Sequence, residues 1–222
     1  FRVAKKAGLV PENTELKFFG FGTMNGSDGK PFKTRAGGVM NLTDLMEMVK
    51  EITASKLNME LVKEEDKDET SEKISIAALK YADFLPYRSK DFIFDVTKFA
   101  DLDGKTGPYL LYSTVRMNSL LEKSGIELDD KKIEKILGVE KEIIRILLEL
   151  PNILKNSIES KSLNEIADYL YRLTSSYNKF YAENHILTCK DDNLKETWLV
   201  LTKLVKDTNL LLLNILAIEV PE

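Results

Sequence analysis

From Gly107 to its end, the chain repeats apolar residues at the three- and four-residue spacing of amphipathic helices. Glycine, proline and a charged turn interrupt the repeat at Gly125, Gly138, Pro151 and residues 190–192, so we predict breaks between helices at these points. This part of the chain is therefore predicted to be an all-helical bundle. The positions expected to line its core are Ile133, Ile136, Leu137, Ile143, Ile144, Leu147, Leu163, Ile166, Ala167, Leu170, Leu173, Tyr177, Trp198, Leu201, Val205, Thr208, Leu212 and Ile215.

The first half of the chain has two segments whose composition is typical of strands. Residues 16–24 are apolar and aromatic enough to form a buried strand, in which Phe18, Phe19 and Phe21 would be packed rather than form a stacking platform. Residues 92–96 have the composition of a second, shorter strand. We therefore expect some sheet in this half.

Helices are predicted on both sides of a charged segment. Residues 41–60 place apolar side chains at helical spacing behind a capping Asn41, and residues 74–85 have a helical pattern as well. Between them, residues 63–72 are nearly all charged, which predicts a solvated or disordered link. Residues 1–8 are expected to form a helix that begins without a cap.

Composition limits the classes of function that fit. With 222 residues, 43% hydrophobic and 31% charged, the chain can bury a core and form one large domain or two small ones. No apolar run approaches the length of a membrane span, and Cys189, the one cysteine, is expected to be a free thiol. The net charge of −4 and the lack of a basic half argue against a strongly basic nucleic-acid surface. Any RNA contact must then be local, as in single-stranded loops whose bases stack on aromatic rings.

A glycine-rich loop at residues 26–38 carries Lys30, Lys33 and Arg35. Glycines let a backbone approach a ligand closely, and the three cations can neutralise the charge of a polyphosphate. The loop fits neither the P-loop pattern nor the dinucleotide-binding glycine pattern. Its residues alone are consistent with a phosphate-binding loop or with a flexible basic surface turn.

A second candidate site lies where the helical half begins, with Pro108 suited to a first helical turn. Tyr109, Tyr112 and Arg116 are three and four residues apart, so they share one helix face that could stack and hydrogen-bond an unstacked base. The alternative is that the two tyrosines line the core while Arg116 pairs with a carboxylate. His185, the only histidine, has no partner at metal-ligand spacing, so we predict a surface or helix-end residue and no metal site.

Residues 28–38 resemble, nearly letter for letter, the loop of arginyl-tRNA synthetases that replaces the Lys-Met-Ser-Lys-Ser signature of class I synthetases. The resemblance covers the whole chain, because later blocks also resemble patterns of this family. These blocks are residues 78–95, 104–116, 169–187 and 218–222.

The resemblance implies a mainly α fold. Residues 1–104 would be the C-terminal part of a class I Rossmann-type catalytic domain, and residues 105–222 would be the all-helical anticodon-binding bundle. Tyr81 and Asp83 lie in a strongly matching block, and no chemical role is expected for them beyond joining the two domains.

The resemblance also implies how the loop acts. In class I synthetases this loop folds over ATP and stabilises the pyrophosphate as the amino acid carboxylate attacks the α-phosphate. Catalytic roles follow for Lys30, Lys33 and Arg35, although Pro31 takes the place of the first signature lysine, which leaves open which lysine is essential. The residues expected to form the ATP-binding loop are Gly29, Lys30, Lys33 and Thr34.

Anticodon-binding roles are implied for Tyr109, Arg116 and Tyr181, because the matching residues of the family line the anticodon pocket. Tyr112 joins them by its place on the same helix face. The partner would be the anticodon loop of an arginine tRNA.

The parent enzyme that the resemblance implies joins arginine to its tRNA through arginyl-adenylate, with ATP and Mg²⁺. The family's ATP-binding His-Ile-Gly-His motif cannot be present with a single histidine, so we expect a C-terminal fragment that is inactive alone and binds no cofactor. A cytoplasmic monomer without a membrane segment is expected. The alternative is a non-catalytic RNA-binding or protein-interaction module derived from a synthetase.

Overall fold

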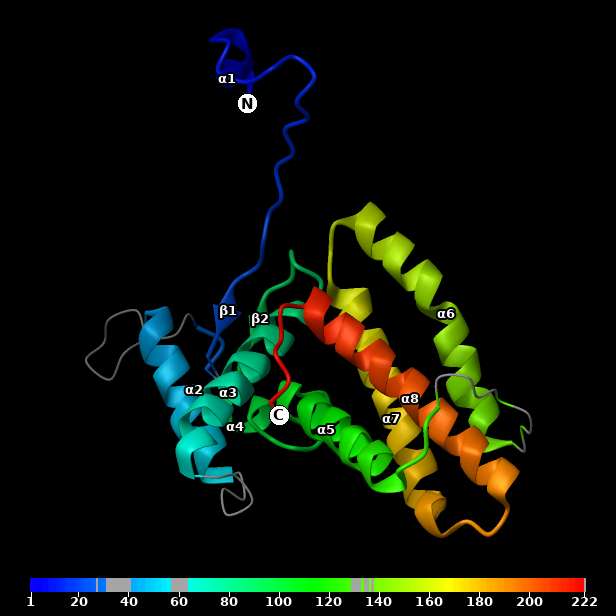
Figure 1. Ribbon diagram of the computed structural model, residues 1–222. Coiled ribbons are helices and arrows are strands. Elements are labelled where there is room, and N and C mark those ends of the chain that lie inside the picture. The colour runs from blue at the N-terminus through cyan, green and yellow to red at the C-terminus, as the bar shows by residue number, and fades with distance from the viewer. Residues whose placement is uncertain are drawn as a thin grey trace.

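The computed structural model describes residues 1–26, 28–30, 41–56, 64–128, 133, 136 and 138–221, and within them it is mainly helical (Figure 1). The elements are α1 (Arg2–Lys6), β1 (Met24–Asn25), α2 (Leu42–Lys56), the 3₁₀ turn η2 (Glu64–Asp66), α3 (Lys67–Phe84), β2 (Phe92–Ile93), α4 (Val96–Phe99), α5 (Gly107–Ser124), α6 (Val139–Ser160), α7 (Asn164–Glu183), the 3₁₀ turn η3 (Ile186–Thr188) and α8 (Asp192–Ile215).

The second half of the chain forms the predicted bundle, in which α7 packs against α6, α5 and α8. Its boundaries follow local chemistry. The Thr106 hydroxyl caps α5 by accepting from the Tyr109 amide, Pro108 lies in the first turn, and Gly125 ends the helix in the left-handed region with φ of 61°. The Asp191 carboxylate caps α8 in the same way.

A large hydrophobic core lies among these helices and includes side chains of α3. Of the positions predicted for this core, Ile136 and Ile215 are exposed, and Leu137 lies outside the described residues. At the end of α8, Leu212 and Leu216 take the core side, one helical turn apart, and this turns Ile215 outward. The helical repeat located the buried face but not its limits.

α3 connects the bundle to the first half of the chain. It packs against α5 on one side and α2 on the other, where a smaller core forms from Leu45, Val49, Ala78, Ala82 and Phe94. As predicted, the Asn41 side chain accepts a hydrogen bond at the start of α2, from the Asp44 amide at 2.9 Å.

The charged segment at residues 63–72 was predicted wrongly as a link. From residue 64 on it is helical, as η2 and the first turns of α3. Lys50 of α2 pairs with Asp68 at 2.5 Å, and Ser71 is buried. The charged side chains therefore lie on the solvent-exposed side of α3, while its other side packs against neighbouring helices.

The buried strand predicted for residues 16–24 is also wrong. Only Met24 and Asn25 pair, in parallel, with Phe92 and Ile93. Phe18 and Phe21 are 83% and 87% exposed, so these two rings are not packed within the described residues, whereas the Phe19 ring contacts Arg88. Aromatic composition predicts a strand, but a strand is buried only where neighbouring elements cover it. Figure 1 shows α1 and the extended chain after it standing apart from the other helices.

Pro151 does not divide the bundle as predicted, because it lies inside the continuous helix α6. Proline removes one helical hydrogen bond, and its cost is lowest where water can reach the freed carbonyl. Pro151 is exposed, which fits this position.

Across the described residues, no helix is long and apolar enough to cross a bilayer.

Candidate nucleic-acid interface

Helices α5 and α7 run side by side in the same direction and bring the predicted aromatic and cationic residues together. Tyr109, Tyr112 and Arg116 come from α5, and Tyr181 comes from the last turn of α7. We call the residues that these two helices present here the α5–α7 face. It includes Asn178 of α7, described below.

Arg116 contacts two aromatic rings. Its guanidinium carbon is 4.6 Å from the ring centre of Tyr181 and 5.5 Å from that of Tyr112. Such contacts stabilise a cation, and they hold the planar guanidinium in one orientation. The ring of Tyr112 is exposed, with 54% of its surface accessible, so it does not line the core as the alternative hypothesis required.

The hydrogen-bond partner of Arg116 is an amide rather than the carboxylate that the alternative required. Its Nη2 donates to Oδ1 of Asn178 at 2.6 Å, and Nδ2 of Asn178 donates to Oη of Tyr109 at 2.7 Å. The same Nδ2 donates to Oγ of Ser113 at 2.8 Å. Asn178 therefore joins Tyr109 and Arg116 into one network.

Asn178 is a residue of this face that was not predicted from the sequence. A signal was present, because Asn178 lies three residues before Tyr181 and so shares its helix face. The partner on α5 is 62 residues away in the chain, and only the packing of two helices shows that contact.

Tyr177 supports the site from the core. Its ring lies 6.3 Å from that of Tyr181, and its hydroxyl is 3.1 Å from Oγ1 of Thr202. Since the Thr202 hydroxyl donates to the Trp198 carbonyl, Tyr177 is the donor to Thr202. Burial raises the pKa of Tyr177 to about 12. Trp198 is buried, as predicted.

A pocket of about 340 Å³ adjoins Tyr181, which forms one wall together with Leu120, His185 and Thr188. His185 is exposed and precedes the 3₁₀ turn η3, which confirms the prediction of a surface histidine at a helix end. No cluster of three metal-ligating side chains occurs among the residues described.

The other end of the α5–α7 face carries a second aromatic pair. Tyr171 lies 5.8 Å from Tyr109, ring centre to ring centre, and the Lys105 ammonium lies 5.2 Å from the Tyr171 ring centre. Lys105 also pairs with Asp168 at 2.6 Å. Aromatic rings therefore line this face from its beginning to its end.

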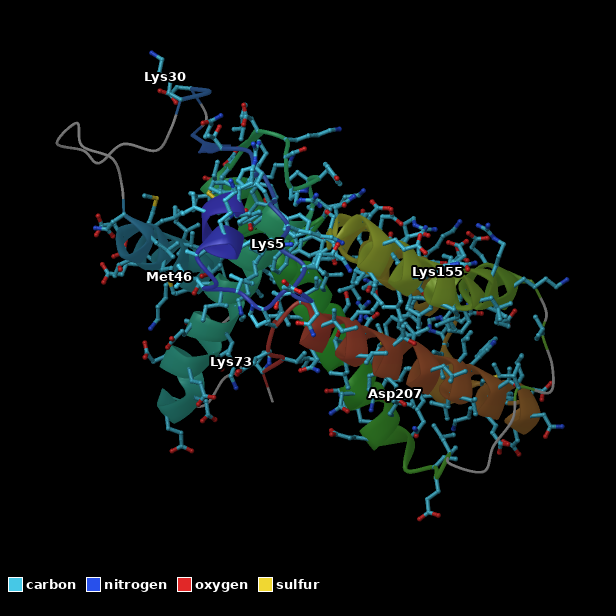
Figure 2. All side chains as sticks on the ribbon, turned by 90° about the horizontal axis from the view of Figure 1, so that it is seen from above. Lys5, Lys30, Met46, Lys73, Lys155 and Asp207 are labelled. Atoms are coloured by element: carbon cyan, nitrogen blue, oxygen red, sulfur yellow. The ribbon has the colours of Figure 1, made fainter. Side chains whose placement is uncertain are left out.

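The structure describes Gly26 and residues 28–30 of the phosphate-loop candidate. Gly29 adopts the left-handed φ of 72°, the Lys30 amide donates to Asp28 at 3.0 Å, and the Gly26 amide donates to the Lys30 carbonyl at 2.8 Å. This tight turn leaves Lys30 exposed, and Figure 2 shows its side chain pointing away from the helices. The other cationic and hydroxyl residues predicted for the loop lie outside the described residues: Lys33, Thr34 and Arg35.

The chain leading to this loop is fixed by hydrogen bonds with residues 88–92. The Gly22 amide donates to the Arg88 carbonyl at 2.8 Å, and the Thr23 amide donates to the Asp91 carboxylate at 2.8 Å. That hydrogen bond lowers the pKa of the Asp91 carboxyl group. A Cβ atom at residue 22 would lie 2.2 Å from the Lys90 carbonyl oxygen, so only glycine fits there.

Arg88 connects this region to the bundle. Its Nη1 donates to the carbonyls of Ser160 and Lys161 at the end of α6, at 2.8 and 3.0 Å. The guanidinium also lies 4.9 Å from the Phe19 ring centre. Arg88 thus satisfies terminal carbonyls of one helix while it contacts the chain before the loop.

Two family models match the chain. Residues 110–222 match the DALR anticodon binding domain, and residues 1–96 match the catalytic domain of class I tRNA synthetases of the arginine type.

Curated relatives match over the full length of the chain. The chain is 40% identical over 226 residues to an arginine–tRNA ligase of Alkaliphilus oremlandii, and 35% identical over 230 residues to one of Francisella tularensis subsp. novicida. Each match covers 100% of this chain, but only 38% and 39% of the respective relatives. The chain thus spans well under half the length of these relatives.

Solved structures share the fold. The arginyl-tRNA synthetase of Thermus thermophilus matches with a TM-score of 0.80 at 20% identity, over 91% of this chain and 34% of that protein. The Plasmodium falciparum arginyl-tRNA synthetase matches with a TM-score of 0.77 at 24% identity, over 100% of this chain and 38% of that protein.

Proposed function

Because this chain belongs to the arginyl-tRNA synthetase family, with its DALR anticodon-binding domain and part of its catalytic domain, we propose that it binds the anticodon loop of an arginine tRNA on the α5–α7 face. The catalytic part corresponds to residues 1–104 and the anticodon-binding part to residues 105–222. Tyr109, Tyr112, Arg116 and Tyr181 are the contact residues.

The arrangement of Arg116 supports this proposal most strongly. A guanidinium in contact with the rings of Tyr112 and Tyr181 brings to one place an exposed ring and a cation with N–H groups that are unpaired among the described residues. Unstacked bases of single-stranded RNA bind such surfaces by stacking and by hydrogen bonds to their edges. This mode of binding needs little net positive charge, which fits a chain with a net charge of −4.

The parent enzyme activates arginine with ATP and Mg²⁺ and transfers it to tRNA in the cytoplasm, and it acts as a monomer. ATP supplies the α-phosphate that the arginine carboxylate attacks. In this chain Lys30 fits a phosphate contact, because the turn at residues 26–30 leaves its side chain exposed at the tip of a closed glycine turn. Lys33 and Arg35 would add charge on the same loop, with Gly29 and Thr34 as its other ATP contacts.

Binding of a labelled arginine anticodon stem-loop to the chain tests the RNA proposal. We expect Tyr109→Ala and Tyr181→Ala each to weaken binding by roughly 1 to 3 kcal/mol, the contribution of one stacked base. The matched control is Tyr87→Ala, which removes an exposed tyrosine outside this face. If neither Tyr109→Ala nor Tyr181→Ala weakened binding, or if Tyr87→Ala weakened it equally, the α5–α7 face would not be the RNA-binding site.

A further inference from the structure

Asn178 has an unambiguous orientation at the centre of the α5–α7 face. A guanidinium has only donors, so the amide atom that faces Arg116 at 2.6 Å must be the oxygen. The amide nitrogen then directs its two hydrogens to Oη of Tyr109 at 2.7 Å and Oγ of Ser113 at 2.8 Å. Both hydrogens of the amide are thus satisfied by side chains of α5.

This orientation determines what Tyr109 can offer a ligand. Because Oη of Tyr109 accepts from Asn178, the hydroxyl hydrogen of Tyr109 is directed elsewhere. Arg116, held by the same amide and by two rings, has further N–H donors, of which Nε is buried and has no hydrogen-bond partner among the described residues. The face therefore presents donors from two residues in a fixed relation to each other.

We propose that Asn178 is the positioning residue of this RNA site, which holds the Tyr109 hydroxyl and the Arg116 guanidinium as donors toward a base edge that carries acceptor atoms. The inference rests on the proposed function and deepens it, because it assigns the chemistry of the base edge. Ring nitrogens and carbonyl oxygens of a nucleobase are such acceptors, whereas an exocyclic amine is not.

Replacing Asn178 by aspartate separates positioning from anchoring. In Asn178→Asp the carboxylate still accepts from Arg116, and more strongly, but it offers no hydrogen to Tyr109 or Ser113. The Tyr109 hydroxyl then donates inward to the carboxylate. Asn178→Leu keeps a side chain of similar size but can neither accept from Arg116 nor donate to Tyr109.

The test is binding of the chain to two labelled stem-loops, one with the arginine anticodon loop and one with its loop bases exchanged. We expect Asn178→Leu and Asn178→Asp each to lose about tenfold or more in affinity for the first RNA, the range of one hydrogen bond to a charged group, and to lose the preference for it. Asn152→Asp makes the same charge change on an exposed position of α6 and should stay within about twofold of the unmodified chain.

Full affinity and preference in Asn178→Asp would overturn the positioning role, because anchoring of Arg116 would then be sufficient. The same conclusion would follow if Asn152→Asp lost as much as Asn178→Asp, since charge alone would explain the loss. Urea unfolding of each variant reports whether a loss of binding comes from a loss of structure.

A measurement without RNA distinguishes this inference from the proposed function. Nuclear magnetic resonance of the Arg116 Nη hydrogens should show restricted rotation in the unmodified chain and in Asn178→Asp, and free rotation in Asn178→Leu. Free rotation in the unmodified chain would overturn the inference whatever RNA binds. Restricted rotation without preference for the arginine stem-loop would instead refute the proposed function.

Discussion

The Tyr81 hydroxyl donates a 2.9 Å hydrogen bond to the main-chain carbonyl of Ala167, and both residues are fully buried. The contact joins α3, which also packs against α2, to the central helix α7 of the bundle. Burial is the main cause that raises the pKa of Tyr81 well above its ordinary value. Tyr81 thus has the connecting role expected for its sequence block.

Tyr81→Phe should lower the free energy of unfolding by about 1 kcal/mol, because it removes one buried hydrogen bond and keeps the ring. Urea unfolding measures this change. Tyr87→Phe is the matched control, since the Tyr87 ring is exposed and should tolerate the change without a measurable loss. Equal stability of Tyr81→Phe and the unmodified chain would contradict the connecting role.

Gly107→Ala should be destabilising by about 1 to 3 kcal/mol, the range of an overpacked contact. A Cβ atom at this position would lie 2.2 Å from the main-chain oxygen of Ala77, so α3 and α5 would have to move apart. In an ordinary helix, replacing glycine by alanine raises stability. A loss of stability at Gly107 would therefore show the close contact between α3 and α5. Gly138→Ala is the control, because a Cβ there meets nothing within 4 Å.

Lys161→Gly should raise the free energy of unfolding by about 1 kcal/mol. Lys161 ends α6 in the left-handed region with φ of 52°, where a side chain is strained and glycine is not. The substitution keeps the carbonyl that accepts from Arg88. Lys155→Gly, on the exposed side of the same helix (Figure 2), should instead cost about 1 kcal/mol. If Lys161→Gly and Lys155→Gly both lowered the free energy of unfolding, the left-handed conformation at residue 161 would carry no strain that glycine relieves.

The raised pKa of Tyr177 predicts that the folded chain loses stability at alkaline pH. Its pKa of about 12 in the folded chain exceeds the ordinary value near 10, so its contribution is complete below pH 10 and is lost between pH 10 and pH 12. At pH 7, Tyr177→Phe should cost about 1 kcal/mol through the lost hydrogen bond to Thr202.

As the pH rises above 10, the unmodified chain should lose on the order of 1.4 kcal/mol per pH unit through Tyr177, and Tyr177→Phe should not. The two free energies of unfolding should therefore cross before pH 12. Tyr112→Phe, which changes an exposed ring, should leave the free energy of unfolding at pH 7 unchanged. Parallel curves for Tyr177→Phe and the unmodified chain would refute the role of burial.

Local signals predicted the helical half of the fold well. The predicted first turn at Pro108 and the predicted break at Gly125 bound α5, because helix initiation and termination depend on a few neighbouring residues. Predictions failed where the outcome depends on distant partners. Phe18 and Phe21 lie in a sequence typical of a strand, but no element of the described structure covers them. The charged residues at 64–72 are helical because the apolar side of α3 packs against other helices while the charged side faces solvent.

The candidate RNA face shows the same division. Helical spacing alone brought Tyr109, Tyr112 and Arg116 to one side of α5, and the structure confirms that Arg116 lies over the Tyr112 ring. The same spacing could not decide whether that side faces the core. Tyr112 is exposed, whereas Tyr109 is half-buried and packs against the core, and both outcomes depend on which helices pack around α5.

The sequence by itself determined the helical pattern from Gly107 onward, the Asn41 cap, the aromatic and cationic face of α5 and the family resemblance, because each of these depends on residues close together in the chain. Only the tertiary structure decided that Asn178 lies between Tyr109 and Arg116, that Tyr181 covers the same guanidinium, and that the Lys30 side chain points away from the helices (Figure 2). The physical reason is that hydrogen bonds and ring contacts act over a few ångströms, and helix packing alone brings residues 62 or more positions apart within that range.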